Sequence, residues 1–107
     1  MSKIPLRQYI QEIEAAINNK QIEEAIAQCR HILEIFPKHV DTYRLLGKAY
    51  LDSQRSTNAA DIFQRVLSSL PDDFISHIGL SIIREEEGEL DGSIWHMERA
   101  FESQPYN

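Results

Sequence analysis

The amino-acid sequence predicts an all-α fold built from three copies of one helix pair. A period of 34 residues runs along the chain and brings Pro37, Pro71 and Pro105 into register. The 107 residues include only four Gly and four Pro, and no alternating apolar runs are joined by Asn-Gly turns, so the sequence has little of what a sheet requires. We therefore expect six helices, two in each of three units.

The period is carried by columns of small or apolar residues that recur at one position in each unit. Columns that agree are Ala25, Ala59 and Ser93; Cys29, Phe63 and Met97; and Tyr9, Tyr43 and His77. Because three copies stay in phase along nearly the full length, we interpret the chain as one domain, residues 1–107, with units at about 6–39, 40–73 and 74–107.

The first unit contains two amphipathic stretches. Apolar residues lie three and four positions apart from Leu6 to Ile17, which predicts a helix, and the polar run 18–20 ends it. A second apolar stripe runs from Ile22 to Leu33 and predicts a helix that ends at Phe36-Pro37.

The second unit carries the clearest pattern. Its residues are Tyr43-x2-Leu46-Gly47-x2-Tyr50, then Ala59-x3-Phe63, then Pro71. Small residues at Gly47 and Ala59 allow two helices to approach closely, while Phe63 and its neighbours fill the seam. Ser56 or Thr57 is expected to cap the second helix by accepting from its free amides.

The third unit opens after Pro71 with Asp72-Asp73, where a helix start favours negative charge. It breaks at the run 87–89, and Asp91 is the expected cap of its second helix. No further helix follows to cover the apolar side of this unit, although such stacks usually need a polar end. We expect either a fragment or an open end that another surface covers.

These residues and spacings resemble the 34-residue tetratricopeptide repeat, with its pattern W-x2-L-G-x2-Y, A-x3-F and P, over nearly the whole chain. Tyr43 stands at the usual Trp position, Ser81 and Arg84 replace the Gly and Tyr of the third unit, and Glu12-Ile13 replaces Leu-Gly in the first. The resemblance implies a right-handed α-solenoid of three helix-turn-helix units, with six antiparallel helices. It also implies a non-catalytic scaffold for protein-protein interaction.

Composition disfavours several partners. A net charge of −6 and a pI near 5.1 would repel phosphate backbones and anionic membrane surfaces, so we expect neither nucleic acid nor membrane as a partner. No run approaches the ~20 apolar residues of a membrane span, and the start lacks the apolar stretch of a signal peptide. We expect a cytoplasmic protein, which agrees with the single Cys29.

No pattern of catalytic or metal-binding residues is evident. The histidines are His31, His39, His77 and His96, and none pairs at the four-residue spacing of a helical metal site. Cys29 occupies the Phe63 column and is predicted to be a small buried thiol, while His77 is predicted to be a packed ring with one hydrogen bond. We expect no metal, no cofactor and no enzymatic activity.

Peptide binding is the function that the family resemblance implies. In that family the first helix of each unit lines a concave groove that holds extended or helical peptides. Carried over by register, the lining is Arg7, Ile10, Glu14 and Ile17; then Asp41, Arg44, Lys48 and Leu51; then Ile75, Ile78, Ile82 and Glu85. We expect the three isoleucines to form an apolar wall and the cations Arg44 and Lys48 to select an acidic side of the ligand.

One subclass of this family is not expected. Repeat domains that bind the C-terminal carboxylate of heat-shock chaperones use two Lys, two Asn and an Arg on their groove helices. The matching positions here are Ile10, Glu14, Leu45, Ile75 and Gly79. None can hold a carboxylate, so chaperone tails are not predicted partners.

Several alternatives stay open at this point. The isoleucines around Ile78 could instead pack on a missing fourth unit or on a second copy of the chain. Ile94 and Trp95 could mediate such self-association into a homo-oligomer. The acidic run 85–91 suits a solvated turn, with a basic segment of a partner as the alternative. The chain could also be the interaction part of a larger enzyme or regulator.

Overall fold

The computed structural model describes residues 5–103, and this range contains six α-helices. They are α1 (Leu6–Asn18), α2 (Ile22–Ile35), α3 (Val40–Asp52), α4 (Ser56–Ser69), α5 (Phe74–Glu86) and α6 (Leu90–Glu102). The first helices of the pairs start at residues 6, 40 and 74 and end at residues 18, 52 and 86, so their bounds recur every 34 residues. The predicted all-α repeat fold is confirmed.

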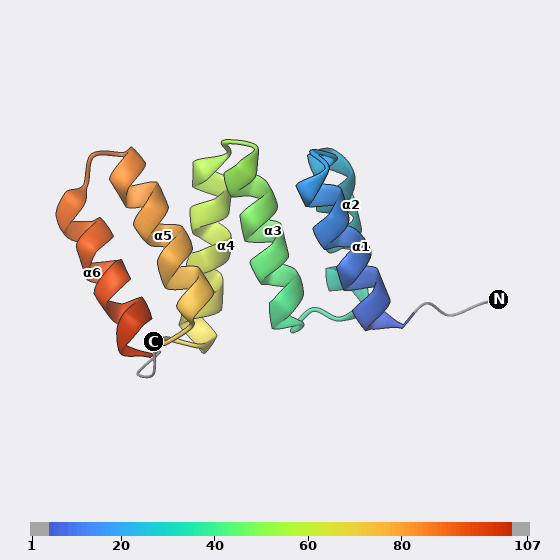
Figure 1. Cartoon of the computed structure of the whole chain (residues 1–107). Helices are drawn as coiled ribbons and strands as arrows, with labels where there is room; N and C mark the ends of the chain where they lie inside the picture. Colours follow the sequence, from blue (N-terminus) through green and yellow to red (C-terminus); the bar gives the residue numbers. More distant parts are fainter. Residues whose placement is uncertain (1–4, 104–107) are drawn as a thin grey trace.

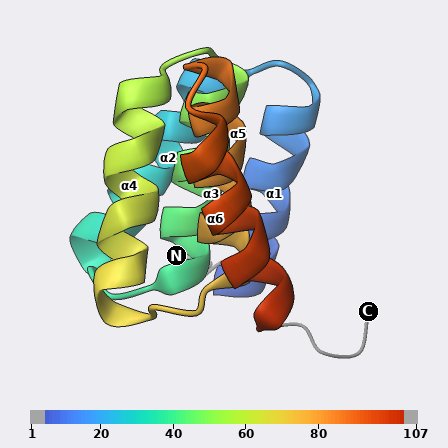
Figure 2. The ribbon, with the colours of Figure 1, turned by 90° about the vertical axis from the view of Figure 1, so that its left-hand side faces the viewer.

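The three helix pairs stand side by side in a row (Figure 1). Contacts join helices that follow one another in the chain, and α3 also contacts α1 and α5. Seen from the α6 end, α2 and α4 lie on one side and α1 on the other (Figure 2). The molecule measures 51 × 27 × 24 Å. Each pair thus buries its apolar faces against its neighbours in the row, as in other repeat proteins.

The turn inside each pair has one backbone conformation in all three units. Its left-handed residue is Lys20, Gln54 or Gly88, with φ of 66°, 62° and 80°. The next amide donates to a carbonyl in the last turn of the preceding helix at 2.8 Å in each unit; these pairs are Gln21 to Ala16, Arg55 to Tyr50 and Glu89 to Arg84. This Schellman arrangement satisfies carbonyls that would otherwise lack partners at the helix end.

The second helix of a pair starts directly after this turn and has no side-chain cap. Arg55 and Glu89 precede α4 and α6, and neither side chain bonds to the amides of its helix. The caps predicted at Ser56 or Thr57 and at Asp91 are therefore wrong. These residues lie within the first turn of their helices, because the Schellman turn brings the chain into helical conformation earlier than a side-chain cap would.

The loops between pairs follow the prediction more closely. Pro37 and Pro71 each come two residues after the last helical residue of α2 and α4, whereas Pro105 lies outside the described residues. Asp73 caps α5, since its carboxylate accepts from the Ser76 amide at 2.9 Å. The predicted negative charge at this helix start is thus confirmed.

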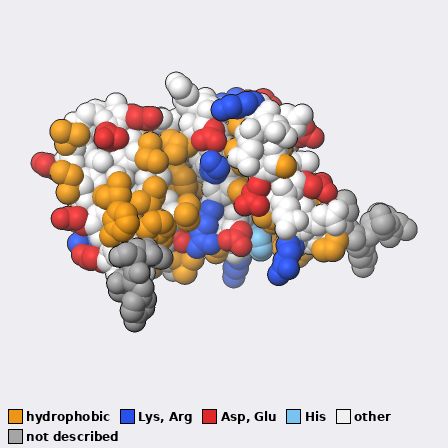
Figure 3. Space-filling model, viewed as in Figure 1, with side chains coloured by type: hydrophobic (Ala, Val, Ile, Leu, Met, Phe, Trp, Pro, Cys, Tyr) orange, Lys and Arg blue, Asp and Glu red, His pale blue; other side chains and the backbone are white. Residues whose placement is uncertain are grey.

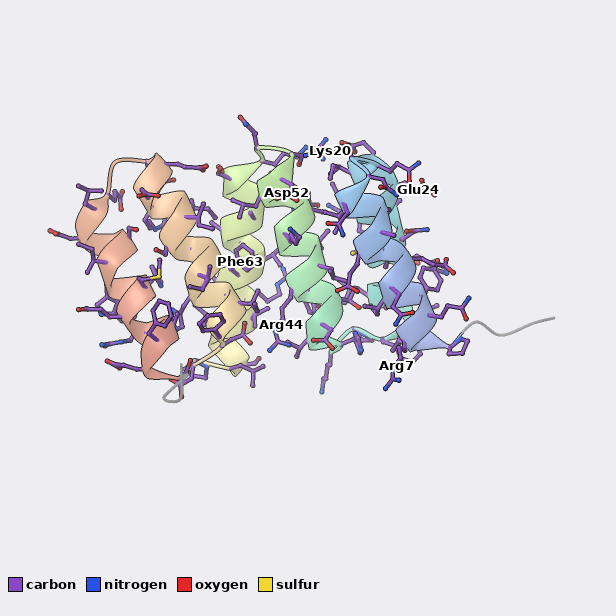
Figure 4. The ribbon with its side chains drawn as sticks, viewed as in Figure 1. Arg7, Lys20, Glu24, Arg44, Asp52 and Phe63 are labelled. Carbon is purple, nitrogen blue, oxygen red and sulfur yellow. The ribbon has the colours of Figure 1, made fainter. Side chains whose placement is uncertain are left out.

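Phe63 of α4 lies at the centre of the core and is 2% exposed. Its ring, which is labelled in Figure 4, packs between Gly47 of α3 and Gly79 of α5. A Cβ atom added to Gly47 would lie 2.6 Å from Cε1 of Phe63, and one added to Gly79 would lie closer still. The predicted close approach is confirmed at Gly47, and Ala59 is fully buried. Gly79 adds a second close approach that the sequence analysis did not identify.

Candidate functional site

Three residue columns on the first helices stay exposed along the row. In α3, which has a helix pair on each side, the side chains of Asp41 and Lys48 are 65% and 52% exposed, and that of Arg44 is 31% exposed. A column that remains open in the middle unit is not covered by the neighbouring units. Residues in these columns are therefore available to a ligand.

In α5 the same columns are apolar. Ile75 and Ile82 are 45% and 38% exposed, and Ile78 is half-buried. We call these three residues the groove wall. Figure 3 shows apolar side chains gathered over α5 and α6, whereas charged side chains are more frequent over α3. Since burial of apolar surface is favourable, an exposed apolar wall of this kind is typical of a contact surface.

The remaining predicted groove residues differ in their surroundings. Ile10 is half-buried, and Glu14 and Glu85 are exposed. Ile17 is only 2% exposed and lies in the core, and Leu51 packs against the core. Ile17 therefore offers almost no surface to a ligand. A hollow of about 500 Å³ lies between α1 and the start of α3, lined by Leu6, Arg7, Ile10, Gln11, Glu14, His39 and Asp41.

The two groove cations are already paired with carboxylates. Arg44 donates from Nε to Oδ1 of Asp73 at 3.1 Å and from Nη1 to Oδ1 of Asp41 at 2.7 Å. Nζ of Lys48 lies 3.4 Å from Oδ2 of Asp52. Arg44, which is labelled in Figure 4, therefore connects the second unit to the third, where Asp73 caps α5. A free cationic pair that would select an acidic ligand is not what this arrangement provides.

Ionisation of this pair is favoured by its hydrogen bonds. Burial raises the pKa of the Asp73 carboxyl, but hydrogen bonds from Arg44 and Ser76 and the charge of Arg44 outweigh burial, so the pKa lies below its ordinary value. The hydrogen bond to Asp73 raises the pKa of Arg44. Both groups are thus charged at neutral pH and hold the start of α5 against α3.

The column that resembles the family's Trp position binds the loop in front of its own unit. The Tyr43 hydroxyl donates to the Pro37 carbonyl at 2.9 Å, and Nε2 of His77 lies 2.7 Å from the Pro71 carbonyl. His77 is 3% exposed, which confirms the predicted packed ring. It also has a second partner that the sequence did not predict, Nδ1 of His96 at 3.0 Å.

The outer side of α6 is the second exposed apolar surface. Ile94 is 57% exposed and Trp95 is 49% exposed. The Trp95 ring packs edge-on against His77, with 5.9 Å between ring centroids, and the guanidinium carbon of Arg99 lies 5.3 Å from its centroid. Trp95 therefore belongs to a cluster beside α5, while Ile94 points away from the helix pair.

Sequence reasoning missed three further residues of this surface, Leu90, Met97 and Phe101. They are 60%, 37% and 52% exposed. The signal was in the period itself, because Met97 occupies the column of Phe63, which is 2% exposed. A residue that is covered by the following unit in one repeat is open where no following helix is present among residues 5–103.

Reactive groups offer little at either surface. Cys29 is fully buried, and burial raises the pKa of its thiol to about 12, so the thiol is protonated as expected. Within residues 5–103 no three His, Cys, Asp or Glu side chains gather as a metal site requires. A membrane crossing would need a longer and more apolar helix than any in this range.

Comparison with known proteins agrees with this architecture. The profile of the tetratricopeptide repeat family matches residues 16–80, more than half of the chain, and the chain belongs to that family. A search of curated proteins finds no match.

Two solved structures have a similar fold at low sequence identity. The structure titled "MamA MSR-1 C2" has a TM-score of 0.78 and 18% identity and covers 94% of this chain. The structure titled "MamA AMB-1 P212121" has a TM-score of 0.75 and 19% identity and covers 89% of it. This chain spans 58% and 52% of the lengths of those two chains.

Proposed function

We propose that the protein is an interaction scaffold that binds a peptide segment of a partner protein along the exposed columns of α1, α3 and α5. The tetratricopeptide repeat family supports the general class, since its members serve as protein-interaction scaffolds. One observation carries the choice of surface. The repeat positions that stay exposed in α3 are occupied in α5 by the three isoleucines of the groove wall.

The ligand class follows from the chemistry of these columns. Ile75, Ile78 and Ile82 would contact an apolar side of the peptide, and their burial would supply most of the favourable free energy. The α3 columns carry paired charges, Arg44 with two aspartates and Lys48 with Asp52. They would face a polar side of the ligand through hydrogen bonds rather than select one sign of charge.

A selection experiment tests this surface. Peptides selected from a random library against the full chain should bind the Ile75→Asp variant about tenfold more weakly or worse, because a charge on the groove wall opposes apolar burial. Ile35 of α2 is also exposed, at 57%, but lies outside the groove columns. Ile35→Asp is therefore the matched control and should bind as the unmodified chain does. Equal binding by all three proteins would reject the groove.

Self-association through α6 is a second candidate, favoured by the exposure of Ile94 and Trp95. Sedimentation of the chain at high concentration tests it, with Ile94→Glu and Trp95→Ala as variants. A concentration-dependent dimer that Ile94→Glu abolishes would support self-association, whereas a monomer throughout would exclude it.

The chain could also act as the interaction part of a longer protein, as its partial coverage of the two MamA chains suggests. The length of the natural reading frame tests that proposal directly. We further propose a cytoplasmic location, which cell fractionation would test.

A further inference from the structure

The outer side of α6 presents one continuous apolar stripe. It consists of Leu90, Ile94, Met97 and Phe101, which we call the end stripe. Their spacing of four, three and four residues places them on one face of the helix. Phe101 packs edge-on against Phe74 of α5, with 5.9 Å between ring centroids, so the stripe is anchored on the preceding helix. An apolar row on a 13-residue helix suits a second helix laid along it.

The repeat geometry indicates which kind of element fits the end stripe. The corresponding columns in α4 hold Ala60, Phe63 and Leu67, which are buried or packed against the core. The element that covers this side of α4 is the first helix of the next pair, α5. By the same geometry, the end stripe accepts an α-helix with an apolar face and not an extended strand.

The charge around the end stripe indicates which charged side chains the incoming helix should carry beside its apolar face. Residues 84–103 contain seven acidic and two basic side chains, a net charge of −5 out of −6 for the whole chain. Both basic side chains are already paired, Arg84 with Glu87 and Arg99 with Glu102. The exposed Asp91 and Glu98, with Glu102, follow one edge of the stripe. Lysine or arginine side chains on the incoming helix would complement this edge.

A second copy of the chain is a poor occupant. Two α6 helices would bring together two segments that each carry a net charge of −2, from Asp91, Glu98, Glu102 and Arg99, which opposes association. The first helix of a copy could instead continue the row, but α1 shows a polar outer side. Its exposed residues include Gln8, Gln11, Glu12 and Ala15.

We propose that the end stripe docks a basic amphipathic helix of a partner protein. The incoming helix takes the place that a following repeat's first helix would occupy, its apolar side chains cover the end stripe, and its cationic side chains face the acidic edge. This surface is separate from the groove wall on α5, so the inference does not depend on the groove function.

A pair of designed peptides tests the proposal on the full chain. The basic probe is a helical peptide with leucines spaced like the end stripe, lysines beside them, and alanine and glutamine elsewhere. The acidic probe has glutamate in place of each lysine. Trp95 is the single tryptophan of the chain and lies on α6 next to the acidic edge of the stripe, so its fluorescence reports binding when the peptides lack aromatic residues.

The basic probe should bind at least about tenfold more tightly than the acidic probe, and its affinity should fall as salt rises. Ile94→Glu should weaken the basic probe by a similar factor, while the groove variant Ile82→Glu should leave its affinity unchanged. The double variant Asp91→Lys with Glu98→Lys should shift preference toward the acidic probe. Circular dichroism of each variant checks that the fold is retained.

Three results would overturn the proposal. Equal binding of both probes would show an apolar surface without charge selection, and binding of neither would show that no such helix docks. A concentration-dependent dimer that Ile94→Glu abolishes, in the absence of any peptide, would assign the end stripe to a second copy.

Discussion

At the scale of single residues, Phe63 determines how closely three helices approach. Its ring fills the space that side chains at Gly47 and Gly79 would need, so α3, α4 and α5 are fitted around one aromatic side chain. Replacing Phe63 with alanine would cost about 3–5 kcal/mol through the cavity it leaves. This is comparable with the whole stability of a domain at the low end of roughly 5–15 kcal/mol.

The close fit predicts a coupling between Phe63 and Gly79. Gly79→Ala should destabilise the chain by about 1–3 kcal/mol, because the new methyl group overlaps the ring. In a Phe63→Leu background, which lacks the outer ring atoms, the same substitution should cost less or stabilise, since alanine favours a helix over glycine. Urea unfolding of the four proteins measures the interaction free energy. Additive effects would place the two residues out of contact.

At the scale of helices and turns, one Schellman turn is built three times from three different residues. Lys20 and Gln54 adopt the left-handed conformation at an energetic cost, whereas Gly88 does so without a Cβ penalty. The turn therefore depends on the helix ends that it joins more than on the residue at its centre. A sequence with Lys or Gln at this position does not reveal such a conformation.

Two glycines near the last of these turns should respond in opposite directions to alanine. Gly88 has φ of 80°, so Gly88→Ala should destabilise the chain by about 1 kcal/mol. Gly92 lies inside α6, and a Cβ there would meet Arg84 Cγ at an ordinary 3.6 Å. Gly92→Ala should stabilise by about 0.5–1 kcal/mol through helix propensity. Thermal or urea unfolding measures the stability of the two variants. Stability changes of the same sign and size would contradict the assigned turn.

The contact between α5 and α6 should make stability depend on pH. Burial lowers the pKa of His96, and the charges of His77 and Arg84 lower it further. His77 Nε2 donates to the Pro71 carbonyl, and the Nδ1 atoms of His77 and His96 lie 3.0 Å apart. Below the ordinary His pKa of about 6.5, the unfolded chain binds a proton at His96 that the folded chain binds less readily. The free energy of unfolding should therefore decrease as the pH decreases.

A matched pair of variants isolates this effect. His96→Gln keeps a donor toward His77 and should flatten the dependence of the urea midpoint on pH between about 7.5 and 5.5. His31 is exposed on α2, and His31→Gln should leave the slope as it is in the unmodified chain. A slope that persists in His96→Gln would assign the pH dependence to other groups.

At the scale of the whole molecule, the period predicted most of the fold. It gave six helices, their order and the buried seam at Phe63, because residues that recur in one column occupy one environment. The period could not predict contacts between units that join residues in different columns of the repeat. Arg44 reaches Asp73, 29 positions away, so one of the two cations that the sequence had suggested for the groove is engaged in a contact between units.

The candidate site was predicted less completely for the same reason. The apolar groove wall followed from register alone, whereas Ile17 was assigned to the groove although its column turns toward the core in the first unit. Leu90, Met97 and Phe101 could have been found by register, since the α4 residues in the columns of Met97 and Phe101 pack in the core. The acidic residues around α6 are evident in the sequence. Their position along one edge of the apolar stripe becomes evident only when residues 90–102 are placed on a helix.

The row of neighbouring contacts predicts that loss of packing stays local. Ile13 of α1 and Ile83 of α5 are both fully buried, at opposite ends of the row. Ile13→Val and Ile83→Val should each cost about 0.5–1.5 kcal/mol. Among the described residues, α1 and α2 make no contact with α5 or α6. Ile83→Val should therefore accelerate hydrogen exchange mainly in α5 and α6. Ile13→Val should do so mainly in α1 and α2. Equal acceleration in all six helices by both variants would instead mean that the three pairs open as one cooperative unit, and stability could then not be assigned pair by pair.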